Sequence, residues 1–200
     1  MSEVYLKKAK KTPETGTSET RKIVERMLSE IEIGKETIAK KYASDLDGFN
    51  GDIIVSQESI KNASKMVPEK LKDDIKFAHE RIKKFAEAQK QSISEFETEL
   101  SPGLWAGQKL IPIQTAGCYV PGGRYAHVAS AIMSITTARV AGVENIIACS
   151  APKGEDGPNP AILYTMNYCG ADKILALGGV QAIASMAVSY THLRAHETNQ

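Results

Sequence analysis

The sequence lacks a long hydrophobic run and a substantial net charge. Its apolar stretches are shorter than the ~20 residues that span a membrane, and the residues before Lys7 and Lys8 lack the hydrophobic region of a signal peptide. We therefore expect no membrane partner and a cytoplasmic location. The formal net charge of +1 over 200 residues gives no global field that would attract nucleic acid. Small-molecule chemistry or protein contacts are the function classes left open.

Paired cysteines and the two best-known phosphate-binding loops are also missing. The three cysteines, Cys118, Cys149 and Cys169, are odd in number, widely spaced and without a C-x-x-C pair. This pattern indicates neither a disulfide framework nor a cysteine zinc site, and it predicts reduced thiols. The patterns G-x-G-x-x-G and G-x-x-x-x-G-K-[ST] do not occur. Any dinucleotide site must therefore be built from other residues.

Charge is unevenly distributed along the chain. Residues 1–100 carry 38 of the 49 charged side chains, which predicts solvated amphipathic helices in the first half. The second half is apolar and contains glycine pairs, as expected for strands buried on both faces between helices. We expect a ligand site there. Residues 1–17 contain four lysines and are predicted to form a flexible arm, with nucleic-acid binding as the alternative.

Residues 18–112 are predicted to form an N-terminal helical or partial α/β domain. A helix begins at a cap on Ser18 or Thr20 and is expected to end at Gly34 as at a C-terminal glycine. A short helix over 36–43, a brief strand over 53–55 and a helix from Ser56 to about residue 66 follow. After Pro68, apolar residues at steps of 4, 3, 4 and 3 predict a longer helix packed on its own domain, with a partner-helix seam as the alternative. These stripe residues are Leu71, Ile75, Ala78, Ile82 and Phe85.

Residues 113–188 are predicted to form a Rossmann-like parallel sheet with alternating helices. A predicted hairpin over 93–113 precedes this sheet, and a strand that ends at Val120 follows the hairpin. A helix over about 127–141 is expected to stop at Gly142, and the remaining elements are strands over 145–149 and 173–177, a helix over 160–169 and a helix from residue 180. This alternation gives the α/β fold class, a parallel sheet and right-handed crossovers. The sheet is expected to be incomplete within this chain.

The first candidate ligand loop is CYVPGG at residues 118–123. Pro121 ends strand pairing, and Gly122 and Gly123 permit positive φ and close approach of a ligand to the backbone. The following helix would offer unpaired N–H groups to an anion. A simple turn without a ligand is the structural alternative.

The second candidate loop is GGVQ at residues 178–181. Gly178 and Gly179 end a strand in the same way, and Gln181 lies near the start of the next helix. A glutamine amide donates and accepts at once, which suits a ribose hydroxyl or a nicotinamide. A helix-capping role for Gln181 is the structural alternative.

Three segments together carry a resemblance to a known family: GCYVPGG at 117–123, ARVAGV at 138–143 and GGVQAIA at 178–184. The chain resembles the histidinol dehydrogenase family over residues 20–188, including the Asp47-Gly48 turn. The resemblance implies an NAD- and zinc-dependent alcohol dehydrogenase in which the loop tyrosine and the loop glutamine contact NAD. The cofactor-binding residues expected on this basis are Tyr119, Pro121, Gly122, Gly123, Gly178, Gly179 and Gln181.

The resemblance also implies a reaction and an assembly. The family oxidises L-histidinol to L-histidine in two NAD-linked steps through an aldehyde, which makes histidine biosynthesis the first expectation. A sister branch oxidises the primary alcohol of 2,3-dihydroxypropane-1-sulfonate to a carboxylate. Residues 111–113, followed by 117–119 and 124–125, look somewhat like that branch. The full-length family is homodimeric. A non-catalytic nucleotide-binding or interaction module is the alternative from another class.

The zinc ligands and the Glu-His acid/base pair of the family come later than the second loop. None is matched here, since residues 1–188 contain only His79 and His127. The resemblance therefore implies that the chain is the N-terminal part of the enzyme and is inactive alone, with no catalytic or metal residue of its own. Residues 189–200 depart from the family pattern and are predicted to be a non-native tail. His192 and His196 within them lack a third zinc ligand.

Overall fold

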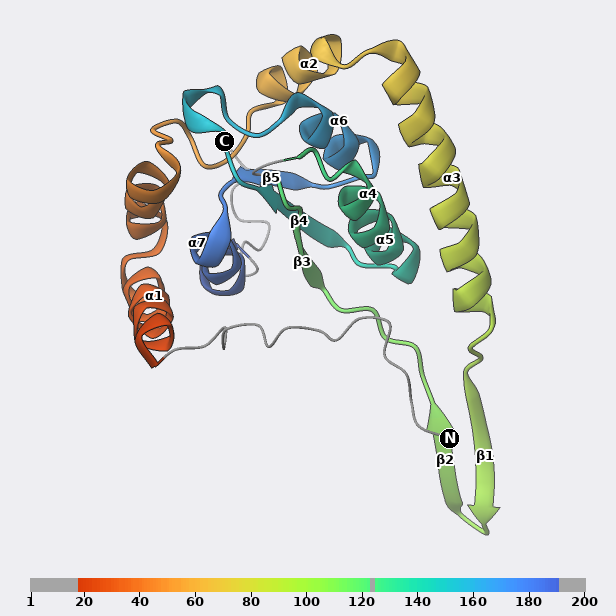
Figure 1. Ribbon diagram of the computed structural model, residues 1–200. Helices are drawn as coiled ribbons and strands as arrows, with labels where there is room; N and C mark the ends of the chain where they lie inside the picture. Colours follow the sequence, from red (N-terminus) through yellow and green to blue (C-terminus); the bar gives the residue numbers. More distant parts are fainter. Residues whose placement is uncertain (1–17, 123–124, 191–200) are drawn as a thin grey trace, which may run out of the picture.

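The computed structural model describes residues 18–122 and 125–190 (Figure 1). The predicted arm over 1–17, Gly123 and residues 191–200 of the predicted tail lie outside this part. The described elements, in chain order, are α1 Ser18–Asp47, α2 Gln57–Met66, α3 Glu69–Gln91, β1 Phe96–Ser101, β2 Leu104–Gln108, β3 Thr115–Tyr119, α4 Val128–Ala131, η1 Ile132–Thr136, α5 Thr137–Ala141, β4 Asn145–Ser150, η2 Gly154–Asp156, α6 Pro160–Tyr168, β5 Lys173–Ala176, α7 Gly179–Ser185 and η3 Met186–Tyr190.

A parallel sheet in the order β3-β4-β5 forms the centre of the fold. Tyr119 of β3 pairs with Cys149 of β4, and Ser150 of β4 pairs with Ala176 of β5. Residues 53–55 run antiparallel beside β5 through a bridge between Ile54 and Leu175. The brief strand expected over 53–55 is therefore reduced to this bridge. The predicted α/β fold with a parallel sheet and alternating helices is confirmed.

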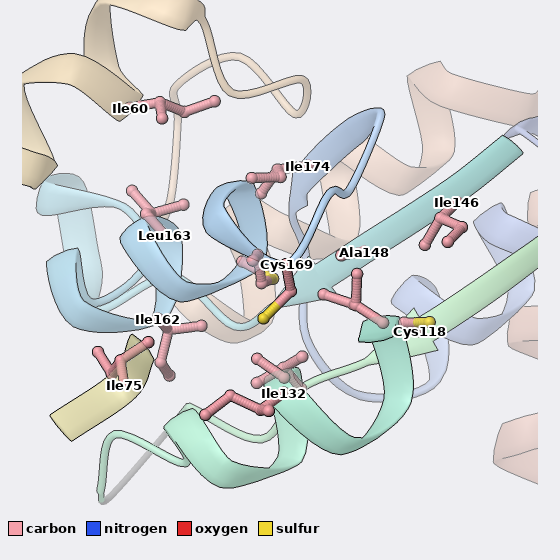
Figure 2. Packing of buried hydrophobic residues seen from close by; sticks show 14 of the residues in the cluster. Ile60, Ile75, Cys118, Ile132, Ile146, Ala148, Ile162, Leu163, Cys169 and Ile174 are labelled. Carbon is pink, nitrogen blue, oxygen red and sulfur yellow. The ribbon is translucent and has the colours of Figure 1, made fainter. Parts of the chain in front are cut away.

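Helices cover both faces of the sheet, and β4 shows why. Ile146 and Ala148 belong to one hydrophobic cluster, and Ile147 and Cys149 belong to the other, as the twofold alternation of a strand requires. The first cluster lies under α2, α3, α4, η1 and α6, and part of it is shown in Figure 2. The second lies under α1 and α7, which pack on each other (Figure 1). The strand is thus buried on both sides, and it reads as a continuous apolar run.

Two predictions in the N-terminal half were wrong in detail. The break in α1 falls at Lys35, with φ 50°, whereas Gly34 has no positive φ. Helix α1 resumes after this break and continues to Asp47, and Gly48 at φ 64° provides the left-handed turn. The stripe on α3 is buried at Ile75 but not at Phe85, which is 64% exposed. The stripe packs on the chain's own core as expected, but it ends before Phe85.

The predicted helix over 127–141 contains a π-helical stretch. The described helix comprises α4, η1 and α5, and it ends at Gly142 with φ 95°, as the sequence predicts. Such a stretch is not encoded by apolar periodicity, since it shifts the following residues around the helix axis. The buried residues Ile132 and Ile135 of η1 pack into the first cluster.

The hairpin of β1 and β2 projects away from the sheet (Figure 1). Its strands pair antiparallel from Phe96 with Gln108 to Ser101 with Leu104, which confirms the predicted hairpin. Every residue of both strands is exposed, including Trp105 at 57%. In the described part of the chain, no helix is long and apolar enough to cross a membrane.

Arg139 of α5 links four segments at the amino end of the sheet. Its guanidinium donates to the carbonyl oxygens of Val143 and Glu144 at 3.1 and 2.9 Å and to that of Gly170. It also bonds Asp172 Oδ2 at 2.6 Å, and the same carboxylate oxygen accepts the Ile146 N–H at 2.7 Å. One side chain therefore holds the turn after α5, the start of β4 and the turn before β5.

The three thiols are free, buried and expected to be unreactive in the folded chain. Burial raises the pKa of Cys118, raises that of Cys149 to about 12 and raises that of Cys169 to about 11. Because the thiolate is the nucleophile, we expect reaction with a thiol reagent at pH 8 to be slower by about a hundredfold or more than for a free cysteine. The measurement is release of thionitrobenzoate from Ellman's reagent, with the guanidinium-unfolded chain as the control that gives three equivalents. One fast equivalent in the native chain would contradict this expectation.

Candidate functional site

The two glycine loops lie at the same edge of the sheet. Because β3, β4 and β5 are parallel, the loops that follow them leave from their carboxyl ends. The first loop continues from Tyr119 at the end of β3, and the second follows Leu177 after β5. Ala151, which follows β4, lies between them. The N–H of Gly179 donates to the hydroxyl oxygen of Tyr119 at 3.4 Å. The structure therefore brings together two loops that are sixty residues apart in sequence.

Tyr119 contacts the second loop through its hydroxyl group and remains partly exposed. Its ring is 36% exposed, while its neighbours Cys118 and Val120 are buried. The hydroxyl oxygen accepts from Gly179, which leaves the O–H hydrogen free to donate to another group. The N–H at the start of α7 is thereby already used.

Gly122 and Gly178 are required by close packing. A Cβ at Gly122 would overlap Ser150 Oγ and lie 3.3 Å from Ile162 Cδ1, and a Cβ at Gly178 would lie 2.6 Å from Ala151 Cβ. Neither glycine has a positive φ, so the predicted conformational reason was wrong for both. Both loops instead pack directly against the end of β4 and the residue after it.

Gly179 and Pro121 complete the described part of the predicted set. Gly179 has φ 54°, the left-handed conformation that glycine adopts without strain, and it is exposed at the start of α7. Pro121 directly follows the last backbone pairing of this strand, in which the Val120 N–H donates to Cys149 O at 2.8 Å, and it is exposed. Gly123 lies outside the described residues.

Gln181 is buried, and its amide is bonded on one side only. The side chain is 2% exposed, and Nε2 donates to Asp47 Oδ2 at 2.9 Å. Oε1 has no hydrogen-bond partner among the described residues, and neither has the buried Ser150 Oγ. Because Oε1 accepts no hydrogen bond from a backbone N–H, Gln181 does not cap α7, and the capping alternative was wrong. Unpaired buried acceptors are costly, and they are typical of positions where a ligand completes the bonding.

Asp47 is the residue at this site that the sequence did not reveal. It is the last residue of α1, and its carboxyl group is half-buried against the second loop. Burial raises the pKa of Asp47, while hydrogen bonds from Gln181 and from the Gly178 backbone lower it. The DG dipeptide at 47–48 predicts only a turn. No local pattern connects Asp47 with a glutamine 134 residues later.

Two surface hollows lie away from the glycine loops. The larger, about 770 Å³, is an apolar groove between α3, the segment before β3 and the helix after the first loop, with Ile111, Ala116 and Met133 in its lining. The smaller, about 520 Å³, is lined by charged residues of α3 and by Arg139. None of the predicted cofactor residues that the structure describes lines either hollow.

Comparison with known proteins decides the family. The family model described as "Histidinol dehydrogenase" matches residues 10–197. The chain belongs to the histidinol dehydrogenase family. The matched range includes residues 189–197 of the predicted tail. That residues 189–200 are non-native stays a prediction.

Relatives within the histidinol dehydrogenase family carry different names. A histidinol dehydrogenase homolog of Pelagibacter ubique is 55% identical over 187 residues, covering 93% of this chain and 44% of the relative. The sulfopropanediol 3-dehydrogenase of Ruegeria pomeroyi is 51% identical over 183 residues, covering 92% and 42%. The crystal structure of histidinol dehydrogenase from Elizabethkingia anophelis matches with a TM-score of 0.81 and 31% identity, covering 88% of this chain and 40% of that one. The chain thus spans less than half the length of these relatives.

The described residues do not form a zinc site of the kind that the histidinol dehydrogenase resemblance implies. His79 of α3 packs edge-on against Tyr168 at 5.1 Å, and burial lowers its pKa. His127 lies in another region, at the start of α4. Residues 18–122 and 125–190 contain no group of three or more His, Cys, Asp or Glu side chains able to hold a metal ion.

Proposed function

We propose that this chain forms the NAD-binding part of an enzyme that oxidises a primary alcohol to a carboxylate through an aldehyde. The observation that carries the proposal is the convergence of the two family loops at the Tyr119–Gly179 contact, beside the unpaired Oε1 of Gln181. An exposed glycine backbone and an unpaired polar side-chain atom at the carboxyl edge of a parallel sheet fit a dinucleotide. The proposed contacts are Tyr119, Pro121, Gly122, Gly123, Gly178, Gly179 and Gln181.

Each residue has a defined part in this proposal. The Tyr119 hydroxyl donates to the dinucleotide while it accepts from Gly179, and Gln181 supplies a second polar contact beside Gly179. The exposed Gly179 lets the ligand approach the backbone. NAD, when bound, accepts hydride from the substrate. Zinc dependence and a homodimeric assembly are proposed from the family alone, and we derive no step through a metal.

Two substrates are candidates, L-histidinol and 2,3-dihydroxypropane-1-sulfonate. The chain is more similar to the sulfopropanediol 3-dehydrogenase of Ruegeria pomeroyi than to the histidinol dehydrogenase of Elizabethkingia anophelis. This difference favours the sulfonate, so we place it ahead of histidinol.

Replacing Tyr119 by phenylalanine should weaken NAD binding about tenfold, since one hydrogen bond to the ligand and the link to Gly179 are lost. The measurement is isothermal titration of NAD into the chain. The matched control is Tyr168→Phe, because Tyr168 is almost equally exposed, at 37%, but lies on α6. Failure of the unmodified chain to bind NAD would overturn the proposed cofactor site.

Activity is tested on a version extended at its C-terminus to the length of its relatives. With added zinc and NAD, NADH formation should be observed with 2,3-dihydroxypropane-1-sulfonate, and L-histidinol is the comparison substrate. NADH from histidinol alone would reverse the order of the two substrates. No NADH from either would refute both assignments, and turnover by the 200-residue chain alone would refute the proposal that it supplies only the cofactor side.

A further inference from the structure

We infer that Asp47 is a positioning residue that fixes the amide of Gln181 so that Gln181 presents a hydrogen-bond acceptor to the bound dinucleotide. The inference rests on the proposed NAD site and goes beyond it in two ways. It adds a residue from the N-terminal helix α1 to the site, and it states which kind of ligand atom Gln181 contacts.

The orientation of the amide follows from the chemistry of its partner. An ionised carboxylate only accepts hydrogen bonds, so the group of Gln181 that faces Asp47 Oδ2 at 2.9 Å must be the NH₂ group. Oε1 therefore points away from Asp47. The reverse orientation would place two oxygen acceptors against each other in a buried position, which is strongly unfavourable.

Asp47 is itself held in place. It ends α1, Gly48 turns the chain away at φ 64°, and the Gly178 backbone also bonds the carboxyl group. Helix α1, which ends at Asp47, also packs directly against α7, which carries Gln181. Asp47 thus engages the end of β5 and the start of α7 at once, and one amide proton of Gln181 is committed to it.

The free acceptor lies where a ligand on the second loop would meet it. A Cβ built on Gly179 would be 3.2 Å from Gln181 Oε1, so this oxygen lies directly beside the exposed, left-handed Gly179. The Tyr119 hydroxyl contacts the N–H of the same glycine. The hydroxyl group of Tyr119 and the amide oxygen of Gln181 therefore both lie next to Gly179.

The chemistry of the ligand atom follows. Oε1 requires a donor, which the dinucleotide supplies as a ribose hydroxyl, as the amino group of adenine or as the NH₂ of the nicotinamide carboxamide. A phosphate oxygen offers no donor near neutral pH and does not fit. Comparison of NAD with ADP-ribose separates the carboxamide from the other two donors, because ADP-ribose lacks the carboxamide.

The test is an exchange of the amide and the carboxylate, read by titration of NAD into the 200-residue chain. Gln181→Glu alone opposes two carboxylates and should weaken NAD binding more than about tenfold, and Asp47→Ala should weaken it about tenfold. Asp47→Asn combined with Gln181→Glu restores a donor facing an acceptor and still presents a carboxylate oxygen beside Gly179. This double variant should bind NAD within about threefold of the unmodified chain.

The controls separate positioning from folding and from failure of the site itself. Asp45→Ala removes an exposed carboxylate from the same turn of α1 and should leave NAD binding unchanged. Thermal unfolding of each variant reports loss of the fold separately. If the unmodified chain binds NAD but the exchange variant binds as poorly as Gln181→Glu, the acceptor role is refuted. Unchanged binding by folded Asp47→Ala refutes the positioning role. No binding by the unmodified chain refutes the proposed NAD site instead.

Discussion

Replacing Ile162 by alanine should lower the free energy of unfolding by about 3 kcal/mol. Ile162 of α6 is fully buried in the first hydrophobic cluster (Figure 2). The substitution removes the buried methyl groups and leaves a cavity where α6 meets the sheet. Because a Cβ at Gly122 would lie 3.3 Å from Ile162 Cδ1, the cavity would also loosen the packing beneath the first glycine loop.

Chemical unfolding in urea, followed by far-UV circular dichroism, measures this loss. Ile183→Ala is the matched control, since Ile183 lies on α7 and is 50% exposed, and its substitution should change the free energy by less than about 1 kcal/mol. Equal losses for the two variants would contradict the assignment of Ile162 to the core.

Replacing Arg139 by methionine should lower the free energy of unfolding by about 2–3 kcal/mol. Methionine retains much of the side-chain length, so the loss reports mainly the charged hydrogen bonds to three carbonyl oxygens and to Asp172. The ion pair alone contributes little, because both side chains are over a third exposed. The larger part comes from the carbonyl oxygens of two turns that lose their donor.

Asp172→Asn provides the second arm of this measurement. An asparagine oxygen accepts from Arg139 and from the Ile146 N–H as the carboxylate does. The substitution should therefore lower the free energy of unfolding by only about 1 kcal/mol. Arg21→Met, at an exposed position of α1, should be neutral within about 0.5 kcal/mol. A loss for Arg139→Met no greater than that for Arg21→Met would show that the network contributes no stability.

The sequence predicted the central fold well because each strand there is a short apolar run bounded by turn residues. The strand over 145–149 was predicted within a residue, since a strand buried on both faces has a continuous apolar sequence. The helix end at Gly142 was predicted because glycine adopts the left-handed conformation that ends a helix. The π-helical stretch in η1 was missed, and the break in α1 was predicted at Gly34, one residue before its position at Lys35. Both depend on how a helix fits its neighbours, which apolar spacing along one element does not record.

The candidate site was predicted in part. The family motifs located Tyr119 and Gln181, and the parallel sheet explains why their loops meet. The packing reason for Gly122 and Gly178 was missed, because it comes from Ser150 and Ala151, on the neighbouring strand and the loop after it. Asp47 was missed as a partner, since its role depends on tertiary structure alone.

The antiparallel bridge between Ile54 and Leu175 has a consequence for how the chain is made. The bridge joins a segment near the start of the chain to β5, which leaves the ribosome about 120 residues later. At usual rates of synthesis this separation corresponds to roughly ten seconds. During that interval the apolar side of α1, which packs against the second cluster in the folded chain, has no sheet to cover.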